Sequence, residues 1–149
     1  MTQVQSVLDW SRQIGSPRSE AIARQYLGLF LFERSLLKSG EARAQDDANA
    51  MEQLEIALKL HDEVNFRQGY RETIAIIFEI AVLEGDVVNA RKFLSMTDDY
   101  SGQSKATNED QMCNAVLAQL RLNGDGARAD RIQLGLTQLG IGQTSTETE

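Results

Sequence analysis

One short motif occurs three times along this chain. It consists of a glycine, an acidic residue directly after it and an alanine four or five positions after the glycine. The two full copies and one looser copy are Gly85-Asp86 with Ala90, Gly124-Asp125 with Ala129, and Gly40-Glu41 with Ala44. Each copy follows a segment with helical apolar spacing. Glycine marks a turn, and aspartate can cap the helix that follows. The motif therefore predicts stacked helical pairs whose turns are marked by glycine.

Apolar residues recur every three or four positions along most of the chain, as amphipathic helices require. Ser16 followed by Pro17 is the usual order of an N-cap hydroxyl and a first-turn proline. The helix that begins there has a wide apolar stripe, which indicates packing on two sides. We expect about seven helices and no strand, over residues 4–14, 17–39, 47–60, 67–83, 86–94, 106–122 and 127–139.

Two polar segments interrupt this pattern. Residues 41–47 are expected to form a loop or a frayed turn, in which Asp46 or Asp47 caps the next helix. Residues 97–104 are expected to form a long loop. We expect one helical domain over residues 1–140, because this length is enough for a continuous core, and a disordered polar tail over residues 141–149.

Charge and hydropathy restrict the partners and the compartment. A formal charge of −7 disfavours nucleic acid and anionic membranes, because phosphate binding needs clustered lysine and arginine. The longest apolar runs fall far below the ~18 residues of a membrane span, and no targeting leader opens the chain. A cytoplasmic protein is the simplest inference. Cys113, the single cysteine, is expected to be a buried small hydrophobe.

Signatures of catalysis and metal binding are missing from the sequence. His61 is the only histidine, lacks the spacing of a metal-binding motif, and is expected to lie at the surface or partly buried. Carboxylate pairs such as Asp46-Asp47 fall at expected helix ends, where acids act as caps. No phosphate-binding loop, nucleophile elbow or zinc spacing is present. We therefore expect no enzymatic activity, no cofactor and no metal site.

The repeat resembles the tetratricopeptide repeat family, whose unit is a helix, a turn and a helix of ~34 residues. The matching residues are Leu27-Gly28 in a first helix, Ala50, Leu54, Ala57 and Leu58 in a second helix, and Gly85-Asp86 with Ala90 and Leu94 across a turn. The junction over residues 14–28 also resembles the long repeats of large bacterial transcription activators and ATP-dependent signalling proteins. The resemblance covers residues 4–139 and implies a right-handed α-α superhelix, in which the small residues pack neighbouring helices together.

This chain departs from the family pattern at two places. Phe78 stands where a small residue is expected beside Ile77, and about ten extra residues separate the helices of the first full pair. We therefore interpret the chain as a divergent member.

By this resemblance, the first helix of each pair lines a concave groove that binds a peptide or helix of a partner protein. The expected function is a non-catalytic scaffold or adaptor. The alternative is a regulatory domain that senses a ligand or peptide in a signalling or transcription system. The groove candidates are Ile22, Gln25, Leu29 and Phe32, then Glu72 and Glu79, and finally Gln111, Asn114 and Arg121. Apolar Leu29 and Phe32 with acidic Glu72 and Glu79 suit an amphipathic or basic segment.

The N-terminal helix copies the second half of a repeat whose first half is missing. We expect the face that carries Val4, Leu8 and Trp10 to be exposed. Either this face or the last helix around Ile132, Leu136 and Leu139 is expected to mediate self-association as a homo-oligomer or to dock a partner. The alternative is a terminal cap whose outer face is polar.

Overall fold

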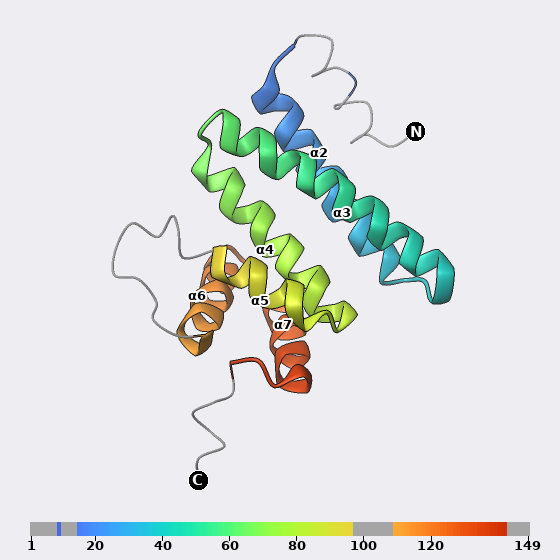
Figure 1. Ribbon diagram of the computed structural model, residues 1–149, viewed down its shortest axis with the longest axis vertical. Coiled ribbons are helices and arrows are strands. Elements are labelled where there is room, and N and C mark those ends of the chain that lie inside the picture. Colours follow the sequence, from blue (N-terminus) through green and yellow to red (C-terminus); the bar gives the residue numbers. More distant parts are fainter. Residues whose placement is uncertain (1–8, 10–14, 97–108, 143–149) are drawn as a thin grey trace. The chain divides into compact units, whose positions relative to one another are not determined.

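Helices make up the regular structure of this protein. The computed structural model describes residue 9, residues 15–96 and residues 109–142. Within these ranges it contains no strand and six helices (Figure 1): α2 (Pro17–Ser35), α3 (Gly40–Glu63), α4 (Arg67–Glu84), α5 (Val87–Met96), α6 (Glu109–Leu122) and α7 (Gly126–Leu139). The all-α class is confirmed. No helix in these ranges has the length and hydrophobicity needed to cross a membrane.

Some expectations fall on other parts of the chain. The expected helix over residues 4–14 lies outside the described residues except for Asp9, which is helical. The expected loop over residues 97–104 also lies outside them. The right-handed superhelix stays a prediction.

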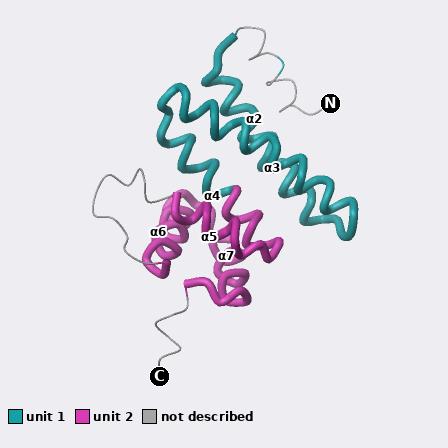
Figure 2. The backbone as a smooth tube through the Cα atoms, viewed as in Figure 1, with its two compact units in different colours: residues 1–76 teal, residues 77–149 magenta. Residues whose placement is uncertain are grey.

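Contacts divide the chain into two compact units, Met1–Ile76 and Ile77–Glu149, with the boundary inside α4 (Figure 2). Unit 1 therefore holds α2, α3 and the first half of α4. Unit 2 holds the second half of α4 with α5, α6 and α7. The single domain over residues 1–140 stays a prediction, and each unit is described by itself below.

In unit 1, α2 and α3 form an antiparallel pair. Arg24 near the start of α2 donates to Gln53 at 2.7 Å, and Arg34 near the end of α2 donates to Asp46 at 2.9 Å. Partners thus move backwards along α3 as the chain advances along α2. Between these two contacts, Gly28 lies so close to α3 that a Cβ atom there would come 2.5 Å from Leu54 Cγ. The expected packing role of this glycine is confirmed.

Replacing Gly28 with alanine is expected to lower the free energy of unfolding by about 1–3 kcal/mol, because the added methyl group overpacks the contact between α2 and α3. Gly126→Ala is the matched control, since nothing lies within 4 Å of its Cβ position. Because alanine is favoured over glycine in a helix by about 1 kcal/mol, the control variant should be at least as stable as wild type. Urea unfolding measures both variants. Equal or greater stability of Gly28→Ala would contradict the close helix contact.

The first two turns of α3 replace the loop that we expected over residues 41–47. Asp46 and Asp47 lie inside the helix and are buried, so neither caps it. Asp46 forms ion pairs with Arg34 and Lys38, each at 2.9 Å. Hydrogen bonds from these two cations lower the pKa of Asp46 to about 2. The expected ten-residue insertion is therefore additional helix, held to the end of α2 by charge and hydrogen bonds.

The glycine motif ends two helices in the same way. Gly85 and Gly124 have φ values of 74° and 84°, the left-handed conformation that glycine adopts without strain. The next residue then donates its N–H to a carbonyl five positions back, at 2.9 Å from Asp86 to Ala81 and at 2.8 Å from Asp125 to Leu120. These are Schellman closures, so the predicted turns are confirmed.

The aspartate side chains of the two motifs form different contacts. Asp86 caps α5, because its Oδ1 accepts the N–H of Asn89 at 3.1 Å. Asp125 makes no side-chain cap and instead lies 3.7 Å from the guanidinium of Arg128. The predicted capping therefore holds for the first copy.

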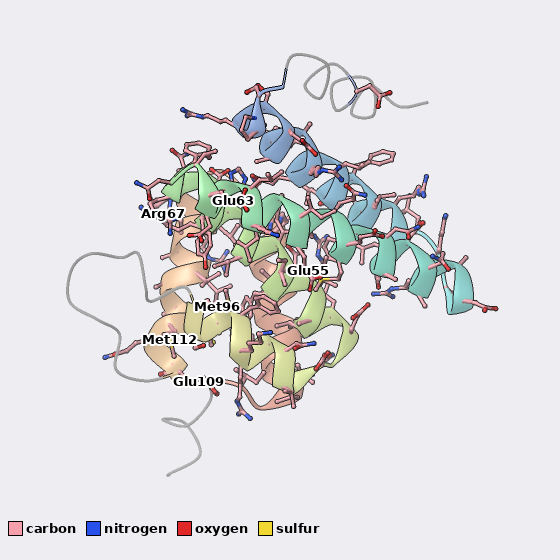
Figure 3. The ribbon with its side chains drawn as sticks, turned by 45° about the horizontal axis from the view of Figure 1, so that its top comes forward. Glu55, Glu63, Arg67, Met96, Glu109 and Met112 are labelled. Atoms are coloured by element: carbon pink, nitrogen blue, oxygen red, sulfur yellow. The ribbon has the colours of Figure 1, made fainter. Side chains whose placement is uncertain are left out.

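An asparagine closes α3 with the same geometry. Asn65 has φ 57°, and the N–H of Phe66 donates to the carbonyl of His61 at 2.9 Å. Arg67, the first residue of α4, donates to Asp62 Oδ1 at 2.6 Å. Figure 3 labels Arg67 and Glu63 at this turn.

The interior of each unit follows the predicted apolar positions. The expected packing alanines and the inward residues of α4 are confirmed as fully or almost fully buried: Ala50, Ala57, Ala90, Ala129, Ile74, Ile77, Phe78, Ala81 and Val82. In unit 2, Gly135 of α7 lies against Val82, where a Cβ atom would come 2.5 Å from Cγ1. Ile141, the first residue of the expected tail, is also fully buried.

Candidate functional site

The groove candidates of unit 1 divide into buried and accessible side chains. Phe32 is 1% exposed and Gln25 is 6% exposed. Ile22 and Leu29 are half-buried, and Glu72 is exposed. The expectation that Phe32 and Gln25 line an open groove is therefore corrected, because both side chains belong to the interior of unit 1.

An exposed apolar stripe runs along α2 instead. Tyr26 is 55% exposed and Phe30 is 39% exposed. They are four residues apart, so their side chains share one face of the helix. Half-buried Ile22 and Leu29 adjoin them on this face. These four residues are called the α2 stripe.

The α2 stripe is rotated from the predicted groove. At 100° per residue, the centre of the stripe lies roughly 65° around the helix from the centre of the predicted set. Ile22 and Leu29 belong to both sets, whereas Tyr26 and Phe30 replace Gln25 and Phe32. The wide apolar pattern of this helix already contained both aromatic residues. The pattern did not show which part of this wide apolar surface is exposed to solvent.

Charged groups border the stripe on two sides. The guanidinium of Arg34 lies 5.7 Å from the centre of the Phe30 ring, within the range of a cation–π contact. On α4, the carboxylate of Glu72 accepts hydrogen bonds from Gln25 and from Gln68, both at 3.1 Å. Two donors thus hold this exposed carboxylate in place next to α2.

Behind the stripe, Gln25 connects Glu72 to a buried histidine. His61 is fully buried, which corrects the expected surface or partly buried position. Its Nε2 lies 2.9 Å from Gln25 Oε1. Since that amide oxygen can only accept, the Nε2 atom carries the proton. Among the described residues, the buried Nδ1 atom has no hydrogen-bond partner.

This arrangement disfavours protonation of His61. Desolvation by burial lowers the pKa of His61 below its ordinary value of 6.5, and the charge of Arg18 acts in the same direction. The carboxylate of Glu72 opposes both by raising it. A second proton would have to be placed on Nδ1, where the described residues offer no acceptor. His61 is therefore neutral in the folded protein around neutral pH.

Acidification is expected to destabilise the protein through His61. Because its pKa is lower in the folded state than in the unfolded state, the unfolded chain takes up the proton first as the pH falls below about 6.5. The free energy of unfolding should therefore decrease between pH 7.5 and 5.5. His61→Gln should remove most of this slope, since His61 is the only histidine. Urea unfolding at several pH values gives both slopes, and an unchanged slope in the variant would contradict the buried neutral state.

The groove candidates of unit 2 also divide by burial. Gln111, Asn114 and Arg121 are exposed on α6, and Arg121 forms an ion pair with Asp130 at 2.9 Å. Glu79, in contrast, is fully buried. The expected groove role of Glu79 is therefore corrected to an interior position.

The carboxylate of Glu79 is held between two arginines of α7. Arg128 Nε donates to Oε1 at 2.8 Å, and Arg131 donates to Oε2 through Nε at 2.9 Å and through Nη2 at 2.6 Å. Charge-assisted, two-pronged bonds of this kind are strong and directional. They attach α7 to α4 within unit 2.

Cys113 is buried, as expected. Burial raises the pKa of its thiol to about 12, and the nearby carboxylates of Glu109 and Asp110 act in the same direction. The thiol is therefore protonated and unreactive at neutral pH. Within the described ranges, no group of three histidine, cysteine or acidic side chains is placed to hold a metal ion.

The predicted self-association residues Val4, Leu8 and Trp10 lie outside the described residues. The alternative surface on the last helix is corrected, because Ile132 and Leu136 of α7 are fully or almost fully buried. Comparison of the chain with protein-family models, with curated proteins and with solved structures gives no match. The resemblance to tetratricopeptide repeats therefore stays a prediction, supported by the residues quoted for it.

Proposed function

We propose that this protein is a non-catalytic interaction module, and that its α2 stripe binds an amphipathic helix of a partner protein. The exposure of Tyr26 and Phe30 carries the proposal. Exposed tyrosine and phenylalanine one helical turn apart form the type of rigid, apolar contact area that interfaces use as anchors. Their neighbours Ile22 and Leu29 extend this area along α2.

The α2 stripe is suited to binding a helix of the partner rather than a flat partner surface. Its residues follow the axis of one helix at spacings of three and four, so a partner helix can lie alongside with apolar side chains at the same spacings. Such a helix would place its own side chains between Tyr26 and Phe30 and over Leu29. The partner in this proposal is a segment with one apolar face.

Charge adds a second requirement on the partner. Glu72 beside the stripe is exposed and held by two amide donors, and Glu33 is exposed on α2. Each carboxylate favours a lysine or arginine at the edge of the bound helix. The proposed partner is therefore an amphipathic helix with a basic rim, which agrees with the net charge of −7 on this chain.

Selection of displayed peptides tests the proposal without knowledge of the natural partner. Helical peptides of about 18 residues, or five turns, are selected against the whole protein and counter-selected against the double variant Tyr26→Ser/Phe30→Ser. Leu37→Ser is the matched control, because Leu37 is 87% exposed and lies outside the stripe. We expect amphipathic, basic-rimmed peptides that bind wild type and Leu37→Ser alike. Peptides that bind the double variant equally well would contradict the proposal.

A further inference from the structure

A hydrogen-bonded chain of three side chains connects the edge of the α2 stripe to the interior of unit 1. At the exposed end, Glu72 Oε1 accepts from Gln25 Nε2 at 3.1 Å. At the buried end, Gln25 Oε1 lies 2.9 Å from His61 Nε2. The chain therefore joins α4, α2 and α3, and it stops at His61 Nδ1, which has no hydrogen-bond partner among the described residues.

The chemistry of these groups allows one direction of donation. An ionised carboxylate can only accept, so the amide of Gln25 must turn its NH2 group to Glu72 and its oxygen to His61. The single ring proton of neutral His61 is then fixed on Nε2. Gly69 of α4 packs beside the other ring nitrogen, where a Cβ atom would come 2.5 Å from Nδ1. A second proton on His61 would therefore lie at a closely packed position without an acceptor.

Charged groups on the neighbouring helices act on His61. Burial lowers the pKa of His61, the carboxylate of Glu72 on α4 raises it, and the guanidinium of Arg18 on α2 lowers it. On α3 itself, the adjacent carboxylate of Asp62 is paired with Arg67 at 2.6 Å. Glu72 is thus the group that favours a charged His61, and it is also the group at the edge of the α2 stripe.

A basic side chain of a partner at Glu72 would change this balance. It would neutralise the charge that favours a second proton on His61. A proton on His61 would in turn place a positive charge behind the carboxylate that the partner needs. Two binding events that are coupled in this way reduce each other's affinity by the same factor.

We propose that proton uptake by His61 releases a basic partner helix from the α2 stripe. The inference rests on the proposed function, in which Glu72 receives the basic rim of the partner. Gln25 and His61 are then positioning residues for the Glu72 carboxylate. They hold it in place at neutral pH and report the charge state of the interior to the surface.

The free protein offers a first test that needs no partner. His61 is the only histidine, so nitrogen NMR of the imidazole reports its tautomer and its titration without overlap. We expect the ring proton on Nε2 at neutral pH. We also expect a proton affinity at least about threefold lower in Glu72→Gln, because this variant removes a nearby negative charge.

Glu63→Gln is the matched control for this measurement, since Glu63 is exposed and lies two residues from His61 in the chain. It should leave the titration of His61 nearly unchanged. Three results would overturn the proposal: a ring proton on Nδ1, no protonation of His61 before wild type unfolds, or equal effects of Glu63→Gln and Glu72→Gln.

The second test uses a histidine-free, basic-rimmed peptide from the selection against the α2 stripe. Calorimetry measures its affinity at pH 7.5 and 5.5, and circular dichroism checks the fold at both. Wild type should bind at least about threefold more weakly at the lower pH, because proton uptake opposes binding. Glu72→Gln and His61→Gln should each show little change between the two pH values, as should wild type with a peptide whose rim lysines are replaced by glutamine.

The outcomes of the second test separate the two proposals. If no selected peptide depends on Tyr26 and Phe30, the proposed function is wrong and this inference is wrong with it. A basic-rimmed peptide that depends on both aromatic residues, but binds wild type equally well at both pH values, would overturn this inference alone.

Discussion

Replacing Glu79 with alanine is expected to lower the free energy of unfolding by about 3–5 kcal/mol, the usual cost of removing one partner from a buried ion pair. Glu79 is fully buried, and it is bonded to both Arg128 and Arg131. Its loss leaves two guanidinium groups, 15% and 31% exposed, beside a cavity without their shared carboxylate. Urea or thermal unfolding of the whole protein measures the effect.

Two further variants separate charge from packing at this site. Glu79→Gln keeps the size of the side chain and one acceptor, so it should destabilise less than alanine but clearly more than a surface change. Asp130→Ala is the control, because the ion pair of Asp130 with Arg121 is exposed and such pairs contribute about 1 kcal/mol or less. Similar losses for Glu79→Ala and Asp130→Ala would contradict the interior position of Glu79.

Replacing Phe32 with alanine is expected to lower the free energy of unfolding by about 3–5 kcal/mol, the usual cost of a phenylalanine cavity. Phe32 is among the largest fully buried side chains and lies on α2. Phe30→Ala provides a control with identical chemistry on the same helix, since Phe30 is 39% exposed. It should change stability by less than about 1 kcal/mol. Equal effects at the two positions would show that Phe32 is not an interior residue.

These two positions also explain how far the sequence could predict the site. The spacing of Tyr26, Phe30 and Phe32 identified one helix with a wide apolar stripe, and that helix is present as α2. Periodicity alone does not say which neighbours cover which part of such a stripe. The family resemblance was used to choose which side chains of this helix face the groove. That choice placed the buried Phe32 in the groove and left out the exposed Phe30.

The helix boundaries were predictable wherever backbone chemistry marks them. Ser16 accepts the N–H of Ser19 at 3.2 Å and Pro17 opens α2, as the Ser-Pro order predicts. The predicted helix over residues 67–83 corresponds closely to α4 (Arg67–Glu84). Gly85 and Gly124 set the turns after α4 and α6, because the left-handed conformation at these positions is readily available only to glycine.

The first turns of α3 were not predictable from hydrophobic spacing. Their buried side chains are Asp46 and Asp47, which hydropathy assigns to solvent. The available signal was of another type: Glu41 to Gln45 are good helix formers, and basic Arg34 and Lys38 lie at the end of α2 and just beyond it. The same limit applies to Glu79 and His61, whose burial depends on partners 36 to 52 residues away in the chain.

The most direct test of the proposed function is the dissociation constant of a selected amphipathic peptide for wild type and for Tyr26→Ser/Phe30→Ser, measured by isothermal titration calorimetry. If both aromatic residues are anchors worth about 2 kcal/mol each, binding should weaken by roughly a thousandfold, at about tenfold per 1.4 kcal/mol. Leu37→Ser should leave it unchanged. A folded double variant that binds within about threefold of wild type would contradict the role of the α2 stripe.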